Sequence, residues 1–471
     1  MIKLDKRLIK VKPSERQMAF QQLEFYGFIH FTINTFTDRE WGDGNESPSL
    51  FNPLELDANQ WVTAVKAAGM KGLILTCKHH DGFCLWPSRY TDHNISASPF
   101  RGGNGDLVRE VSKACKKEGL KFGIYLSPWD RHDKRYGQGK LYDDYFVSQL
   151  KELLTDYGEI FSVWLDGACG EGNNGKKQVY DWNRYYNTVR ELQPKACISV
   201  CGPDIRWCGN EAGDTRPSEW SVVPEKLRDA EKVSDASQKE DVSEFRFKKL
   251  SSMDLDLGSR QALANESKLI WYPAEVNTSI RPGWFYHEHE DNQVRSLEEL
   301  LEIYYNSVGG NATFLLNLPP DRRGLIHEND VERLKEMGHQ LRKNFEINLL
   351  EEAEIEAEIS PESNDVSQVR KDNYDCYFEV PAGKEPVILR MSWKTEQDIS
   401  FVVIKENIQK SQRIESFELY AVENKEPIKV YEGTVVGYKK IVRLDQVKTK
   451  ELMLIIRDYR VAPVIAFIGV Y

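Results

Sequence analysis

Short apolar runs alternate with amphipathic stretches through the first two-thirds of this 471-residue sequence, which leaves few folds open to it. Continuous apolar runs are typical of strands that are buried on both faces. Their alternation with helical patterns predicts a parallel sheet. We expect strands at 25–31, 72–78, 122–127, 161–167, 196–202, 205–209, 269–275 and 313–319. Eight such strands predict closure into a (β/α)8 barrel.

The helical patterns lie between most of these strands. They cover 56–70, 105–119, 143–158, 179–193, 296–308 and 327–345. Helices are missing around the fifth and sixth strands, and the polar stretch 214–266 has little periodicity. We therefore expect a distorted barrel rather than a regular one.

The pattern changes after about residue 347. Short alternating runs with turn residues between them are typical of an antiparallel β-sandwich. The fold class is thus predicted to be α/β, with a barrel at 1–346 that carries the active site and an all-β sandwich at 347–471. We expect the sandwich to cap the barrel, and the alternative is that it contributes to ligand binding.

Charge and hydropathy exclude several classes of partner. The net charge is −11 with acidic and basic residues mixed, whereas nucleic-acid binding needs a basic face. No run of about 18 apolar residues exists, so no membrane span is expected. The N-terminus lacks the apolar stretch of a signal peptide. We expect a soluble protein, periplasmic or extracellular if a leader was removed and cytoplasmic otherwise. The eight cysteines form no CxxC pair, which predicts neither a zinc site nor a disulfide network.

Residues that could carry chemistry stand at or just after the ends of the predicted strands, where (β/α)8 barrels hold their reactive groups. In chain order they are His30, His79, His80, Tyr125, Asp166, Glu211 and Glu275. The barrel closure would bring acids, histidines and aromatic rings together on one rim.

Two carboxyl groups on one rim suit the hydrolysis of a glycoside. Asp166 follows an apolar strand and precedes a glycine, so it would be held rigidly as a nucleophile. Glu211 or Glu275 could be the acid/base, which requires a raised pKa. The histidines would supply neutral donors and acceptors for sugar hydroxyls.

Two other readings of these residues stay open. His79, His80 and Asp81 could bind a metal in a metal-dependent hydrolase, although adjacent positions are not the usual ligand spacing. A non-catalytic carbohydrate-binding protein is the other, and the presence of both acids argues against it. The preferred interpretation needs no metal and no cofactor.

Several longer strings resemble the α-L-fucosidases of glycoside hydrolase family 29. They are FYGFIHFTINTF at 25–36, DREWG at 38–42, GLILTCKHHDGFCLWPS at 72–88, FGIYLSPWDRH at 122–132 and VWLDG at 163–167. The resemblance covers most of the first ~345 residues. It implies a distorted (β/α)8 barrel followed by a β-sandwich, as the pattern of strands also predicts.

The resemblance also implies roles for individual residues. Asp166 matches the family nucleophile, and Trp284 matches the aromatic residue that packs on the C6 methyl group of fucose. GPDIRWCGNEAG at 202–213 is similar to the branch that prefers α-1,3/4-linked fucose on Lewis-type glycans, which favours Glu211 over Glu275 as acid/base. Glu275 would then orient the sugar. The fucose pocket would be formed by His30, Glu40, Trp41, His79, His80 and Tyr125.

The expected substrate is a fucosylated oligosaccharide or glycoconjugate. Fucose lacks a hydroxyl at C6, so its pocket needs an apolar wall beside polar partners. Admitting one extra hydroxyl costs such a wall only about 1–3 kcal/mol. A β-D-galactosidase, or an enzyme acting on both sugars, is therefore the alternative on the same barrel.

Overall fold

The computed structural model describes residues 3–238, 240–250, 255–358, 365–380 and 386–471. Eight parallel strands form one sheet in the order β5-β4-β3-β2-β1-β10-β9-β6. Their bounds are β1 Phe25–Ile29, β2 Gly72–Lys78, β3 Lys121–Leu126, β4 Ser162–Leu165, β5 Cys197–Val200, β6 Arg206–Trp207, β9 Ala274–Ser279 and β10 Thr313–Asn317. A parallel bridge between Ser199 and Ile205 brings the two ends of the sheet together. The predicted distorted barrel is confirmed.

Alternation along each strand separates two apolar layers. On β1, Phe25 and Ile29 pack outward against the helices, whereas Tyr26 and Phe28 pack inside the barrel with Trp164 of β4. The barrel interior is therefore filled by side chains and is not a pore. His30 and Asp166 directly follow β1 and β4. Because side chains alternate along a strand, both residues point toward the inside of the barrel.

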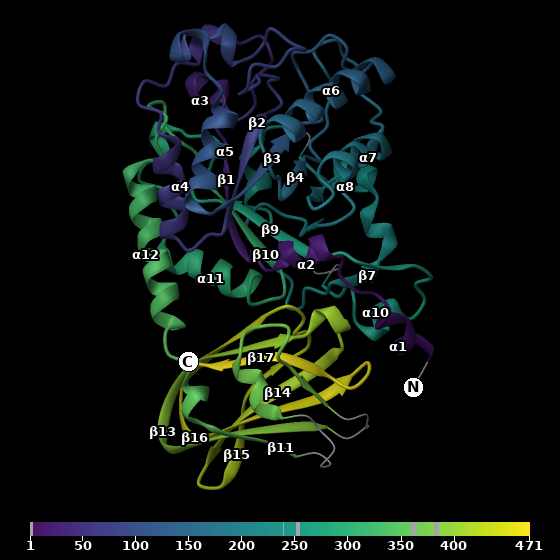
Figure 1. Ribbon diagram of the computed structural model, residues 1–471, viewed down its shortest axis with the longest axis vertical. Helices are drawn as coiled ribbons and strands as arrows, with labels where there is room; N and C mark the ends of the chain where they lie inside the picture. The colour runs from purple at the N-terminus through teal and green to yellow at the C-terminus, as the bar shows by residue number, and fades with distance from the viewer. Residues whose placement is uncertain (1–2, 239, 251–254, 359–364, 381–385) are drawn as a thin grey trace.

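Helices surround the barrel (Figure 1). The longer ones are α4 Ala58–Ala67, α5 Leu107–Glu118, α6 Lys140–Asp156, α7 Trp182–Leu192, α11 Leu297–Ser307 and α12 Glu328–Asn344. α5 illustrates how the sequence sets their ends. The Asp106 side chain accepts a hydrogen bond from the Arg109 N–H at its start, and Gly119 ends the helix with a φ of 73°, which favours glycine. Shorter helices are α1 Lys3–Leu8, α2 Glu15–Gln21 and α3 Ile33–Thr37.

The predicted seventh strand at 269–275 is wrong. Leu269–Trp271 is β8, which pairs antiparallel with β7 Val222–Pro224 outside the barrel. The barrel strand is β9, which begins after Pro273 and pairs with β10. Hydrophobicity favoured the wrong segment, because β9 is buried along its whole length although four of its six residues are polar. Glu275 is consequently the second residue of a strand and not the last.

A long excursion connects β6 to β9. It contains β7 and three short helices, α8 Ala230–Ala236, α9 Ser243–Arg246 and α10 Arg260–Leu263. The described residues between β5 and β6 form no helix, as the sequence predicted. β5 ends at Val200 with a φ of 67°, a conformation that strains a β-branched residue.

An antiparallel sandwich follows the barrel. Its strands are β11 Glu354–Ala357, β12 Phe378–Glu379, β13 Val387–Glu406, β14 Ile414–Glu423, β15 Glu426–Gly433, β16 Lys440–Tyr459 and β17 Val464–Val470. β13 and β16 are each 20 residues long, and their pairing shifts register between Ser392 and Gln397. β13 pairs with β11 in its first half and with β17 in its second half.

The sandwich packs against the amino ends of the barrel strands. Glu24, which precedes β1, is 3.0 Å from Lys439 Nζ and accepts a hydrogen bond from the Tyr438 hydroxyl at 2.9 Å. Figure 1 shows α12 running along the side of the barrel toward the sandwich. The described helices are all too short or too polar to cross a membrane.

Candidate active site

One cavity lies at the carboxyl ends of the barrel strands. Its walls combine aromatic rings with carboxyl, imidazole and amide groups from β1, β4, β5, β6, β9 and the loops that follow strands. The lining residues are Phe28, His30, Glu40, Trp41, His79, His80, Trp164, Asp166, Ala168, Val200, Trp207, Glu211, Ser237, Gln238, Asn277 and Trp284. Eight of the ten residues predicted for the site are among them; Tyr125 and Glu275 are not.

Asp166 follows β4 and is held by its own loop. The Tyr125 hydroxyl donates to Oδ2 at 2.9 Å, and the Ala168 N–H donates to Oδ1 at 2.8 Å. Burial raises the pKa of Asp166, while these two hydrogen bonds favour the ionised form. The side chain is still 19% exposed, so the carboxylate can meet a ligand in the cavity. Tyr125 contacts Asp166 and not the cavity itself.

Gly167 lets the segment between β6 and β9 pack closely against the loop that carries Asp166. A Cβ atom on Gly167 would lie 2.2 Å from Ser237 Oγ and 3.2 Å from Ser237 Cβ. A larger residue at this position would force Ser237 to shift, so glycine favours the close approach. Ser237 and Gln238 thereby come to line the cavity beside Asp166.

Glu211 lies in the loop after β6 and faces the same cavity. Its carboxylate accepts a hydrogen bond from Trp284 Nε1 at 3.0 Å. Burial raises the pKa of Glu211 to about 7; the bond from Trp284 lowers it, and the negative charge of Asp166 raises it further. A carboxyl group with this pKa can hold a proton near neutral pH and release it during a reaction.

Glu40 is the most extensively bound carboxylate of the cavity. Oε1 accepts from the Phe285 N–H at 3.0 Å and lies 2.9 Å from His287 Nε2. Oε2 accepts from the Trp284 N–H at 2.9 Å and from Arg246 at 3.1 Å. Through these hydrogen bonds, Glu40 connects the loop after α3 to the loop that carries Trp284.

His287 and Arg246 also contact Glu40, although the sequence did not predict either residue as part of the site. Burial alone would lower the pKa of His287, but hydrogen bonds to Glu40 and Asp38 raise it to about 9, so the imidazolium is favoured. Burial would raise the pKa of Glu40, and His287 and Arg246 hold it below its usual value. Neither residue follows a predicted strand, and no pattern in the chain marks them.

The three histidines of the cavity are neutral, because burial lowers the pKa of His30 to about 4 and those of His79 and His80 well below 6.5. His30 Nδ1 is 2.8 Å from Asn317 Oδ1, and His80 Nδ1 is 2.7 Å from Ser127 Oγ. Among the described residues, His79 Nδ1 has no hydrogen-bond partner although it is buried. A buried nitrogen of this kind normally forms a hydrogen bond, so a ligand or a water molecule is expected to bind it.

Glu275 does not lie on the rim, which corrects the expectation from the sequence. It is buried inside the barrel, where Tyr26 Oη donates to one oxygen at 2.5 Å and Trp164 Nε1 donates to the other at 2.7 Å. Burial raises its pKa to about 7, against the effect of both hydrogen bonds. Glu275 therefore supports the Trp164 ring from below the cavity.

The alternative metal-binding group of His79, His80 and Asp81 is not assembled in the described part of the chain. The Asp81 carboxylate instead accepts hydrogen bonds from the Thr32 hydroxyl and the Phe83 N–H. It stabilises the turn after β2.

A parallel barrel whose mouth holds carboxyl groups among aromatic rings and polar side chains is typical of glycoside hydrolases. The model of the α-L-fucosidase family matches residues 14–346. The chain is 40% identical to α-L-fucosidase 1 of Arabidopsis thaliana over 468 residues, which are 98% of this chain and 87% of the relative. The chain belongs to the α-L-fucosidase family.

Solved structures agree with this assignment. The fold superposes on a crystal structure from Bacteroides ovatus with a TM-score of 0.85 and 42% identity, covering 100% of this chain and 76% of the other. It also matches the Ruminococcus gnavus GH29 fucosidase in complex with fucose, with a TM-score of 0.83 and 28% identity over 98% and 95% of the two chains. The barrel followed by a sandwich is common to these proteins.

Proposed function

We propose that this α-L-fucosidase releases terminal α-L-fucose with retention of configuration, through a covalent intermediate on Asp166. The observation that carries the proposal is the contrast between two carboxyl groups in one cavity. Burial raises the pKa of both groups, but two hydrogen bonds favour the ionised form of Asp166, whereas the pKa of Glu211 is raised to about 7 and its carboxylate accepts one bond, from Trp284. A nucleophile must be ionised, and an acid must hold a proton.

The two residues divide the reaction between them. Asp166 attacks the anomeric carbon while Glu211 gives its proton to the departing glycosidic oxygen, which leaves fucose esterified to Asp166. Glu211, now ionised, takes a proton from water as that water attacks the anomeric carbon. The C–O bond to Asp166 breaks, and both carboxyl groups return to their first state.

The remaining residues of the cavity bind the sugar. His30, His79, His80 and Glu40 offer hydrogen-bonding atoms to the ring hydroxyls, and the unpaired Nδ1 of His79 supports this role. Trp41 and the Trp284 ring supply apolar surface, with Trp284 beside the C6 methyl group. Tyr125 orients Asp166, and Glu275 orients the Trp164 ring.

Two measurements test the retaining mechanism. NMR of the first product formed from an aryl α-L-fucoside should show α-L-fucose before it mutarotates. A 2-fluorinated fucosyl fluoride should add one fluorofucosyl mass to the peptide that contains Asp166. β-L-Fucose as the first product would refute the mechanism, and a label on another residue would refute the choice of nucleophile.

We further propose that the preferred substrate carries α-1,3/4-linked fucose on a branched, Lewis-type glycan. The string at 202–213, which contains Glu211, supports this preference through its resemblance to that branch. Fucose release from a Lewis-type trisaccharide should exceed release from a linear 2′-linked fucoside by at least tenfold in kcat/KM. Equal rates would contradict the linkage assignment without affecting the proposed mechanism.

A further inference from the structure

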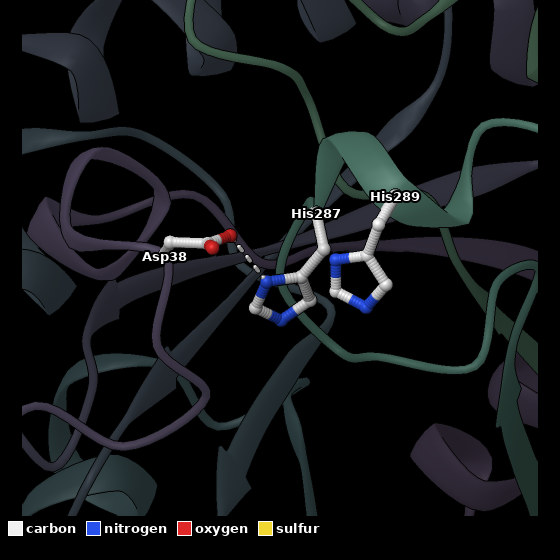
Figure 2. Close-up of side chains that lie close together, drawn as sticks. All are labelled: Asp38, His287 and His289. Atoms are coloured by element: carbon white, nitrogen blue, oxygen red, sulfur yellow. Dashed lines mark hydrogen bonds and ion pairs between the residues drawn. The ribbon is translucent and has the colours of Figure 1, made fainter.

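Asp38, His287 and His289 form a second cluster of polar side chains, outside the cavity. One possible ligand atom from each lies within 4.8 Å of the other two. Figure 2 shows His287 between the Asp38 carboxylate and the His289 ring. Asp38 Oδ1 is 2.7 Å from His287 Nδ1, and the two imidazole rings are 5.4 Å apart between centroids.

The backbone presents these residues from two separate turns. Asp38 ends α3 in the left-handed conformation, with a φ of 58°. His287 precedes the single 3-10 turn Glu288–Glu290, and His289 lies within it. The Asp38 side chain is 51% exposed and that of His287 is 9% exposed, so an ion can enter from the Asp38 side.

The second nitrogen of His287 gives independent support for a ligand at this place. Nε2 lies 2.9 Å from Oε1 of the buried Glu40, on the opposite edge of the ring from Asp38. Metal-binding imidazoles almost always donate their other N–H to a carboxylate, which fixes the ring orientation. His287 has that arrangement, with Nδ1 directed toward Asp38 and Nε2 toward Glu40.

The geometry points to a binding site for a divalent transition-metal ion formed by Asp38, His287 and His289. Two imidazole nitrogens and one carboxylate oxygen suit Zn²⁺, Co²⁺, Ni²⁺ or Cu²⁺, whereas Ca²⁺ and Mg²⁺ prefer oxygen ligands. Three protein ligands leave a fourth, tetrahedral position to water. Asp38, His287 and His289 do not line the cavity, so this ion would lie outside the proposed fucoside site.

Zn²⁺ binding to the chelator-treated, tag-free protein tests the site by isothermal titration calorimetry. We expect about one tight Zn²⁺ per chain and at least tenfold weaker binding by His289→Ala. The matched control is His339→Ala, which removes an exposed histidine of α12 and should bind Zn²⁺ like the wild type. Asp38→Asn should also weaken binding at least tenfold, because asparagine accepts the left-handed backbone but loses the charge.

Co²⁺ provides a second readout of the ligands. The visible absorption of four-coordinate Co²⁺ should appear in the wild type and in His339→Ala and be lost in His289→Ala. Absence of Zn²⁺ binding, unchanged binding by His289→Ala, or equal weakening by His339→Ala would each overturn the proposal. Metal-free His289→Ala should keep wild-type activity on an aryl fucoside, so the test does not depend on the proposed catalytic roles.

Discussion

The mouth of the barrel and the layer just below it each hold a glutamate whose pKa is raised to about 7 by its removal from water. At the mouth, Glu211 faces the cavity and receives one hydrogen bond, from Trp284. In the layer below, both oxygens of Glu275 are bound, by Tyr26 and Trp164. A raised pKa therefore does not identify the catalytic acid, since burial alone produces it. Access to the substrate separates the two residues.

The largest expected effect tests whether the mouth is catalytic at all. Asp166→Asn should lower kcat/KM on an aryl fucoside on the order of 10⁴-fold or more, because the neutral amide cannot attack the anomeric carbon. Fucose binding, measured by calorimetry, should change less than tenfold. Retained turnover would show that Asp166 is not the nucleophile. The cavity at the barrel mouth would then lose its claim to be the catalytic site.

The next largest effect is expected from substitutions that compare Glu211 with Glu275 directly. Glu211→Gln should lower turnover of a natural glycan by roughly 10²–10⁴-fold, because a poor leaving group needs the proton. Glu275→Gln keeps the shape and should cost less than tenfold. Added azide should accelerate Glu211→Gln on an activated aryl fucoside and leave Glu275→Gln unaffected. The reverse pattern would assign the acid/base to Glu275.

Substitution of the two glutamates should affect the free energy of unfolding in the opposite order, with the larger loss at Glu275. Glu275→Ala leaves the Trp164 N–H buried without its acceptor and leaves the Tyr26 hydroxyl with Thr313 as its remaining partner. The variant should therefore lower the free energy of unfolding by roughly 2–4 kcal/mol. Glu211→Ala removes one bond at an open cavity and should lower it by less than about 1 kcal/mol. Denaturant unfolding measures both. Equal losses would mean that the two carboxyl groups have the same structural role.

The smallest effect is the dependence of activity on pH. Glu211 must be protonated, so kcat/KM should fall as pH rises through about 7, by up to tenfold per pH unit. Asp166 must be ionised, so kcat/KM should also fall as pH drops through its raised pKa. On an activated fucoside, Glu211→Gln should lose the fall above pH 7. If Glu275→Gln loses it instead, the group that titrates lies in the interior.

The sequence predicted the strands that are apolar along their whole length. β2 begins and ends at the predicted residues, 72 and 78, and the acids and histidines after β1, β2 and β4 lie in the cavity as strand ends should. β9 was misplaced because its buried residues are polar, and a hydrophobicity pattern cannot distinguish a polar strand inside a barrel from a loop. Its bounds depend on pairing with β10.

Strand periodicity and neighbouring motifs were thus sufficient for the barrel, the sandwich and the candidate nucleophile, because the alternation of strands and helices and the residues at strand ends can be read from short stretches of the chain. The different surroundings of Glu211 and Glu275, and the contacts of Glu40 with His287 and Arg246, were decided by the tertiary structure alone. Arg246 lies 206 positions from Glu40 in sequence, and Trp164 lies 111 positions from Glu275. No local pattern records such partners, since burial and hydrogen bonding at those sites depend on how distant loops and strands come together.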